Sequence, residues 1–148
     1  MSAVTVLHGV DAVRGAVGRD LGTTGWTELT REQVDEFHRA VGSAPGTGPG
    51  DTGDGDGTAP PLLVLALTNL FMPQLVEVRG VAMGVNYGTG EVRFPAAAPV
   101  GARLRAGAEV VACDDIAGGV QTTIRITVEA EGGADPVCVV DALSRWIV

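Results

Sequence analysis

The amino-acid sequence predicts an α+β domain in which an antiparallel sheet is wrapped around one buried helix. Residues 120–129 alternate between apolar side chains on one face and polar side chains on the other, the pattern of a half-solvated antiparallel strand. Residues 60–72, PPLLVLALTNLFM, are almost wholly apolar and begin with proline, as in a helix buried on most of its circumference. The chain has 148 residues, of which 45% are hydrophobic, the length and apolar content of one domain with one core.

The second half of the chain is expected to be rich in strands. The expected strands are residues 83–94, 102–113, 120–129 and 137–147. Gly88 and Gly90 interrupt the first of them. Short turn segments join the other three in sequence order, and this spacing predicts a three-strand meander.

Two helices are expected before the apolar one. Residues 9–21 carry valine and leucine at spacings of three and four, although Gly15 and Gly18 weaken this helical pattern. Thr30 and Gln33 form a capping box ahead of a helix over residues 31–41.

Residues 42–57 form a glycine-rich run, GSAPGTGPGDTGDGDG. Such a run cannot bury enough apolar area to offset the entropy of ordering it, so a flexible loop is expected. Because neither flank is large enough to fold alone, residues 1–148 are interpreted as one domain that contains this loop.

Charge and composition exclude several classes of function. The net charge is −8, so a nucleic-acid backbone would be repelled, and aromatic residues make up only 4% of the chain, too few for base-stacking surfaces. All ten basic residues are arginine. Schiff-base chemistry and a phosphate-binding lysine are therefore not available.

No membrane segment, metal site or cofactor is expected. The longest apolar stretch, residues 60–67, is too short to span a bilayer, and no basic leader precedes an apolar run, which predicts a cytoplasmic protein. Cys113 and Cys138 lack metal-ligand spacing and are interpreted as buried structural thiols. Neither His8 nor His38 has a neighbouring cluster of ligands.

Three sequence segments carry a resemblance to a known family. They are VAMGVNYGTGEVRFPAAAPVGARLRAGAEV, LTREQVDEFHRAVG and GGVQTTIRITVEAEG, and together they extend over nearly the whole chain. The sequence resembles the MaoC-like dehydratase family. The resemblance implies the hotdog fold, a dimer, and hydration or dehydration of acyl thioesters.

The residues that carry the family's chemistry differ here. The family uses an Asp and a His in the loop after the helix at 31–41, and these positions fall on Ser43 and near Gly48. The family's central helix tends to begin Gly-Thr-x-Ala-His-Gly, with backbone N–H groups that can polarise a thioester carbonyl. Here Pro60, Pro61 and Leu62 replace the last three of those residues, and two prolines remove two donors. Ordinary hydration is therefore disfavoured.

Candidate site residues come from the resemblance and from their positions. The candidate catalytic residues are Tyr87, Asn86, His38 and Asp56, the last from a loop that also contains Asp51 and Asp54. The candidate substrate-binding residues are Leu63, Leu67, Asn69, Leu70, Phe71 and Arg93, with Met72 beside them. Each also has a structural explanation: core packing for the apolar residues, solvation for the loop acids, and a salt bridge for Arg93.

Three functions are open at this stage. The first is an enzyme whose pocket acts on a hydrophobic acyl- or polyketide-derived substrate by elimination, isomerisation or cyclisation, through shape and hydrogen bonding. The second is a non-catalytic subunit that pairs with an Asp/His-bearing hotdog hydratase or dehydratase. The third is a retained enoyl-thioester hydratase in which His38 or a loop Asp is the substitute base. A homodimer is expected for the first and a heterodimer for the second.

Overall fold

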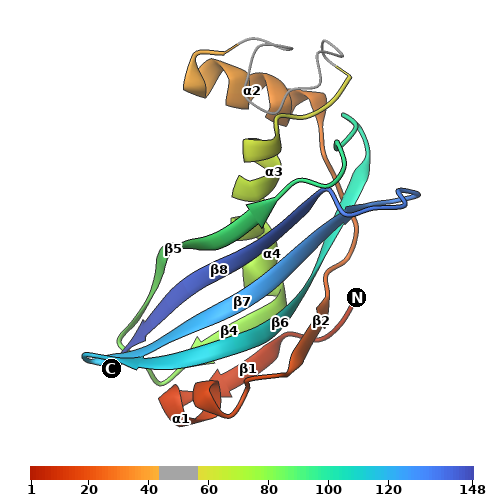
Figure 1. The fold of residues 1–148 in the computed structure, drawn as a ribbon. Helices are drawn as coiled ribbons and strands as arrows, with labels where there is room; N and C mark the ends of the chain where they lie inside the picture. Colours follow the sequence, from red (N-terminus) through yellow and green to blue (C-terminus); the bar gives the residue numbers. More distant parts are fainter. Residues whose placement is uncertain (44–56) are drawn as a thin grey trace.

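A computed structural model describes residues 1–43 and 57–148, which form helices and strands in an α+β arrangement (Figure 1). In chain order the elements are β1 (Thr5–His8), α1 (Gly9–Arg14), β2 (Asp20–Thr23), β3 (Thr27–Glu28), α2 (Arg31–Val41), α3 (Pro61–Ala66), α4 (Thr68–Leu75), β4 (Val76–Arg79), β5 (Met83–Arg93), β6 (Arg103–Ile116), β7 (Gly119–Ala130) and β8 (Cys138–Ile147).

The main sheet is antiparallel and contains the meander that the sequence predicts. Its strand order is β2-β6-β7-β8-β5, and β3 also pairs with β6. The long pairs run from Leu104 opposite Ala130 to Ile116 opposite Gly119, and from Gly119 opposite Ile147 to Val128 opposite Cys138. In the described part of the chain β5 pairs only with β8, so β5 is an edge strand.

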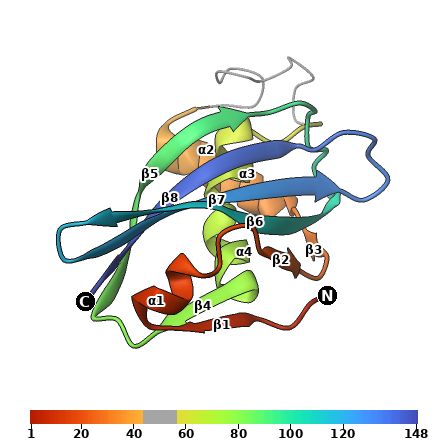
Figure 2. The same ribbon diagram turned by 60° about the horizontal axis from the view of Figure 1, so that its bottom comes forward.

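One face of the sheet is packed on the central helices. Figure 2 shows the strands curving around α3 and α4. The alternation along β7 places Ile124 and Ile126 against this side, where they are at most 2% exposed, and Phe71 of α4 is fully buried. Burying a side chain of this size contributes about 1.5–3 kcal/mol, so each of these residues stabilises the packing of the sheet on the helices.

The central helix differs from the single helix expected over residues 60–72. It is two helices, α3 and α4, that meet at Leu67. The Thr68 hydroxyl donates to the Leu65 carbonyl at 2.7 Å, and such a side-chain bond competes with the regular helical ladder at this point. α4 also extends beyond residue 72, the expected end of the helix, and continues through Pro73 to Leu75.

The first helix is shorter than expected. α1 ends at Arg14, and Leu21 lies in strand β2, where it is 2% exposed. Gly18 has φ +85°, a left-handed conformation that turns the chain back toward the sheet. The valine and leucine spacing over residues 9–21 therefore reflects a helix followed by a strand, both of which contact the same core.

The capping box before α2 is confirmed. The Gln33 N–H donates to the Thr30 hydroxyl at 3.1 Å, and the Thr30 N–H donates to the Gln33 side-chain oxygen at 3.0 Å. α2 ends at Val41, and the N–H of its C-cap residue Gly42 donates to the Arg39 carbonyl, while the Ser43 N–H donates to the His38 carbonyl at 2.9 Å. This ending fixes the position of Ser43 relative to α2.

A small two-stranded sheet was not predicted from the sequence. β1 and β4 pair in parallel, with Thr5 opposite Val76 and His8 opposite Arg79. Both strands are four residues long, too short for a clear alternating pattern. Across residues 1–43 and 57–148, no helix is long and apolar enough to cross a lipid bilayer.

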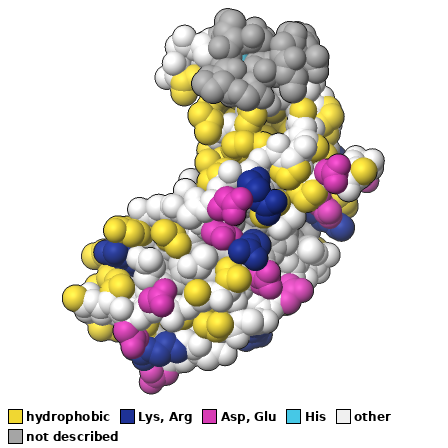
Figure 3. Space-filling model, viewed as in Figure 1, with side chains coloured by type: hydrophobic (Ala, Val, Ile, Leu, Met, Phe, Trp, Pro, Cys, Tyr) yellow, Lys and Arg dark blue, Asp and Glu magenta, His cyan; other side chains and the backbone are white. Residues whose placement is uncertain are grey.

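The outer face of the main sheet is charged. Arg125 of β7 donates to Asp141 of β8 at 2.8 Å, and Arg105 of β6 pairs with Glu129 of β7. Figure 3 shows acidic and basic side chains intermixed over this face and hydrophobic side chains gathered around α3. Exposed ion pairs of this kind contribute little stability, but they match opposite charges across neighbouring strands.

Candidate functional site

A groove lies between the central helices and the edge strand β5. It consists of two cavities of about 240 and 220 Å³. The first cavity is lined by Leu65, Ala66, Thr68, Asn69, Met72, Asn86, Gly88, Thr89, Ile126, Ala142, Leu143 and Ser144. The second is lined by Asn69, Met72, Pro73, Val76, Val78, Gly84, Val85, Asn86, Ser144 and Trp146. Four residues are common to both, so the two cavities are parts of one groove.

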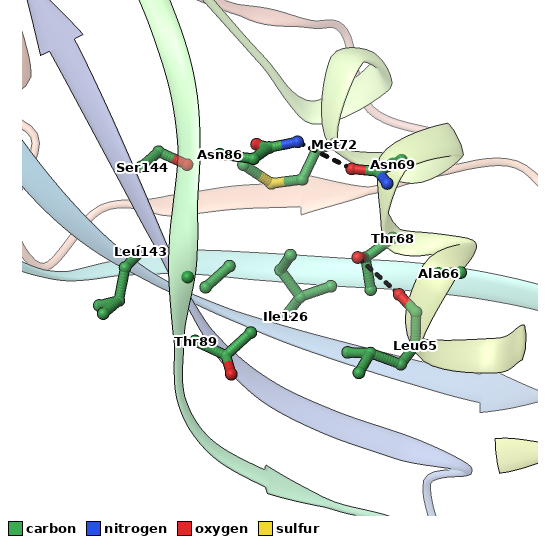
Figure 4. Close-up of a pocket in the computed structure, with 12 residues that line it drawn as sticks. Leu65, Ala66, Thr68, Asn69, Met72, Asn86, Thr89, Ile126, Leu143 and Ser144 are labelled. Carbon is green, nitrogen blue, oxygen red and sulfur yellow. Dashed lines mark hydrogen bonds between the residues drawn. The ribbon is translucent and has the colours of Figure 1, made fainter. Parts of the chain in front are cut away.

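Two carboxamides join the two sides of this groove. The Asn86 side-chain nitrogen, from β5, donates to the Asn69 side-chain oxygen, from α4, at 3.0 Å (Figure 4). In the close-up the Met72 side chain lies beside this pair. Because each amide still has a further donor or acceptor, the pair can also bond to a ligand in either cavity.

The polar groups of the groove are neutral. Thr68, Thr89 and Ser144 contribute hydroxyls to the first cavity. Among the residues that the structure describes, none of those lining either cavity is acidic, basic, histidine, cysteine or tyrosine. These linings can bind by shape and hydrogen bonds, and they contain no group that titrates near neutral pH.

The two predicted asparagines lie in the groove, and the predicted leucines and phenylalanine do not line it. Leu63 and Phe71 belong to the core, with exposed fractions of 8% and 0%, and Leu67 packs against it. Leu70 is 44% exposed. These four residues follow the apolar helix pattern, which does not indicate which side of the helix adjoins a cavity.

Tyr87 lies on the outer face of the sheet. β5 is irregular between Asn86 and Gly88, so Tyr87 has no partner in the register with β8. The Arg145 guanidinium lies over its ring at 3.4 Å from the centroid, and Arg145 also donates to Gln121 at 2.9 Å. The catalytic role of Tyr87 stays a prediction, and its ring does not line either cavity.

The remaining candidates are apart from the groove lining. Arg93 pairs with Glu91 at 3.2 Å on the sheet edge. His38 is 6% exposed on α2, and its Nδ1 lies 2.8 Å from the Ser43 hydroxyl. Ser43 is the position at which the family's Asp is expected. Asp56 lies outside the described residues.

Several lining residues were not predicted from the sequence. Ser144 and Trp146 alternate with Arg145 along β8, and this period of two could have assigned them to the inner face. Thr68, Thr89 and Gly84 carried no such signal, because their places depend on the helix break and on the pairing of β5 with β8.

Cys138 is buried, as expected, whereas Cys113 is only partly buried, which differs from the expectation. Burial raises the pKa of the Cys138 thiol to about 11 and also raises the pKa of the Cys113 thiol. Neither sulfur is bonded to the other. Within the described ranges no cluster of three or more His, Cys, Asp or Glu side chains could hold a metal ion.

Sequence comparison identifies a clear relative. The chain is 36% identical over 142 residues to 3-hydroxyacyl-thioester dehydratase Z of Mycobacterium tuberculosis, covering 89% of this chain and 91% of that protein. The same relative occurs in Mycobacterium bovis at the same identity. No protein-family model matches the chain.

Solved structures have the same fold. A MaoC-like dehydratase from Rhodospirillum rubrum superposes with a TM-score of 0.65 at 15% identity, covering 89% of this chain and 92% of that one. The C-terminally truncated HadBC 3R-hydroxyacyl-ACP dehydratase complex of Mycobacterium tuberculosis gives 0.59 at 21% identity, covering 84% and 93%. With a hotdog sheet around a central helix and a dehydratase relative over most of its length, this chain belongs to the MaoC-like hotdog family of (R)-hydratases and dehydratases.

Proposed function

We propose that this chain binds a hydrophobic acyl thioester, or a related polyketide-derived molecule, in the groove and acts on it without the Asp/His pair of its family. The observation that carries the proposal is the neutral lining of the groove in the described part of the chain. A thioester substrate is supported by the name of the relative, a 3-hydroxyacyl-thioester dehydratase.

The residues that line the groove limit the reactions that it can catalyse. An isomerisation or cyclisation can gain much of its rate when one reactive conformer is held in a shaped cavity. An elimination or a double-bond isomerisation also needs a base to move a proton, and the described lining residues supply none. Cyclisation of a bound acyl chain without proton transfer is therefore the reaction class that we favour.

The carboxamide pair is proposed to orient the ligand. Asn69 and Asn86 reach the groove from opposite sides and are already 3.0 Å apart. A thioester or hydroxyl oxygen placed between the cavities would accept from a remaining amide N–H. Asn86 would then act on the substrate directly, as the sequence predicts.

The binding test uses octanoyl-pantetheine and titration calorimetry. We expect the wild-type protein to bind it and Asn86→Ala to bind up to about tenfold more weakly, the loss of one hydrogen bond. Thr123→Ala is the matched control, because Thr123 is a polar residue of β7 that lines neither cavity. Absence of binding by the wild-type protein, or an equal loss in both variants, would contradict the proposal.

A second candidate function is a non-catalytic subunit that pairs with an Asp/His-bearing hotdog protein. The observation that favours it is the exposed edge strand β5, where Met83 and Tyr87 are 55% and 53% exposed. HadBC, whose fold this chain shares, is a complex. Co-expression with such a partner tests this candidate: a stable mixed dimer that replaces the homodimer supports it, and a homodimer that excludes the partner rejects it.

A third candidate is hydration with a substitute base, either His38 or an Asp of the loop that contains Asp51, Asp54 and Asp56. The His38 imidazole is bonded to Ser43, near the end of α2. If His38 is that base, His38→Gln abolishes turnover of an enoyl thioester, whereas unchanged turnover removes it from consideration.

A further inference from the structure

We propose that the second cavity of the groove holds the far end of the acyl chain and that Trp146 sets the longest chain that fits. This inference rests on the proposed function, since it assigns an orientation to the ligand of the same groove. The thioester end would then lie in the first cavity, nearer to α3.

The two cavities differ in the side chains that each has to itself. The first has the hydroxyls of Thr68 and Thr89 to itself. The residues that line the second cavity alone are Pro73, Val76, Val78, Gly84, Val85 and Trp146. All of these are apolar apart from the indole N–H, which is already bonded. The hydroxyls of Thr68 and Thr89 can bond to a polar thioester end, and the side chains unique to the second cavity can pack against an apolar tail, which is the direction that we propose.

Trp146 is held in one orientation. Its indole N–H donates to the Thr122 hydroxyl of β7 at 3.0 Å, and that hydroxyl donates to the Ser144 carbonyl at 3.4 Å. Thr122 is 1% exposed, so this hydroxyl has no competing solvent. The bond fixes the five-membered side of the ring toward β7.

Gly84 fixes the other side of the ring. It lies opposite Trp146 in the pairing of β5 with β8. A Cβ atom added to Gly84 would lie 2.6 Å from Cζ3 and 3.0 Å from Cε3 of the indole. The six-membered ring thus rests on bare backbone, and the indole spans from β7 to β5 across the inner face. Trp146 is a rigid wall of the second cavity.

The volume of the second cavity limits the length of the acyl chain that it can hold. At roughly 30 Å³ for a water-sized group, 220 Å³ holds about seven such groups, which corresponds to a medium-length acyl tail. Affinity should rise about fourfold for each methylene buried until the chain reaches the indole, and should then stop rising.

Tryptophan fluorescence tests where the acyl chain ends. Because the protein has two tryptophans, Trp26→Phe leaves Trp146 as the only fluorescent tryptophan. The probes are straight-chain acyl-pantetheines from butanoyl to hexadecanoyl, each with and without bromine on the terminal carbon. Bromine quenches an indole only near contact, so we expect bromine-specific quenching to peak at one medium chain length.

Two variants test whether Trp146 sets the limit. Trp146→Leu should shift the affinity maximum to longer chains, because a shorter side chain leaves the wall open. Gly84→Ala should shift it to shorter chains, because its Cβ displaces the indole into the cavity. Gly90→Ala is the matched control on the same strand: Gly90 lines neither cavity, its Cβ would come no closer than 3.4 Å to Asp141, and the maximum should stay in place.

The outcomes separate this inference from the proposed function. If acyl-pantetheines bind but show no bromine-specific quenching at any length, or if Trp146→Leu and Gly84→Ala leave the maximum unchanged, the chain-end assignment is wrong and the groove remains an acyl site. If no acyl-pantetheine binds to the Trp26→Phe protein or to the wild type, both the proposed function and the chain-end assignment are wrong. The quenching experiment requires no change at Trp146 and stands even if Trp146→Leu does not fold.

Discussion

At the scale of single residues, the Asn69 and Asn86 amides connect the central helix to the edge strand. Their hydrogen bond of 3.0 Å joins α4 to β5. The sequence indicated both residues, Asn69 because a carboxamide in an apolar helix needs a partner and Asn86 from the resemblance. It could not indicate that each is the other's partner, since they are seventeen residues apart.

A double-mutant cycle measures the coupling between these two amides. We expect Asn69→Ala and Asn86→Ala to interact by about 0.5–1 kcal/mol in the free energy of unfolding, because the bond is exposed to solvent. Urea unfolding of the wild type, both single variants and the double variant gives this value. The pair Asn86→Ala and Thr30→Ala should be additive, and additivity of the asparagine pair as well would contradict the contact.

The Cys138 thiol should make stability depend on pH in the alkaline range. Burial raises its pKa from 9.0 to about 11, so between these pH values the unfolded chain loses a proton that the folded protein keeps. The free energy of unfolding should therefore fall as the pH rises through this window. Cys138→Ala should reduce this pH-dependent decrease in the free energy of unfolding. Cys113→Ala should keep the share of the decrease that Cys138 causes. Equal slopes in the wild type and Cys138→Ala would refute this role.

At the scale of elements, local signals predicted what depends on neighbours in sequence. The capping box of α2 and the alternation of β7 were both read correctly, because each is formed by residues within a few positions of one another. The break between the two helices at Leu67 and the irregular pairing of β5 at Tyr87 were not predicted. Both arise where an element adapts to a partner that is distant in sequence, and the groove is built at these two places.

The capping box should be worth about 1 kcal/mol. Thr30→Ala removes the oxygen that accepts the Gln33 N–H at 3.1 Å, leaving a helix donor without its partner. Thr30→Ser keeps that oxygen and should recover most of the loss. Chemical denaturation distinguishes the variants, and equal stability of Thr30→Ala and the wild type would show that the cap does not stabilise the protein.

At the scale of the whole molecule, β5 presents the free edge of the main sheet. Met83, Val85 and Tyr87 on this strand are 55%, 39% and 53% exposed, and an edge of this length and apolar character is suited to pairing with a second chain. The fold resemblance predicted a dimer, and the composition alone did not. The strand supplies the surface that a dimer requires.

A charge on this edge should disrupt the dimer. We expect the wild-type protein to have the mass of a dimer in solution and Met83→Lys to shift it toward the monomer, because the edge would then bury an unpaired charge. Val41→Lys is the control, since Val41 is 58% exposed on α2, away from β5. Light scattering measures the mass, and a Met83→Lys protein that remains fully dimeric would place the interface elsewhere.

The site was less predictable than the fold for a physical reason. Apolar periodicity identifies which residues are buried, and Leu63 and Phe71 are indeed core residues. It does not identify which buried face leaves space beside it, because the cavities depend on the helix break and on small residues such as Gly84. The polar residues of the groove were found only where an unusual setting or the resemblance singled them out.

This member of the family is proposed to bind acyl thioesters without hydrating them. The most direct measurement is loss of the conjugated enoyl absorbance when the purified protein is mixed with crotonyl and longer enoyl thioesters, with its mass measured in the same buffer. We expect a dimer in whose presence the enoyl absorbance falls no faster than at the uncatalysed rate. Robust hydration by that dimer would contradict the proposal and would make His38 the first residue to replace.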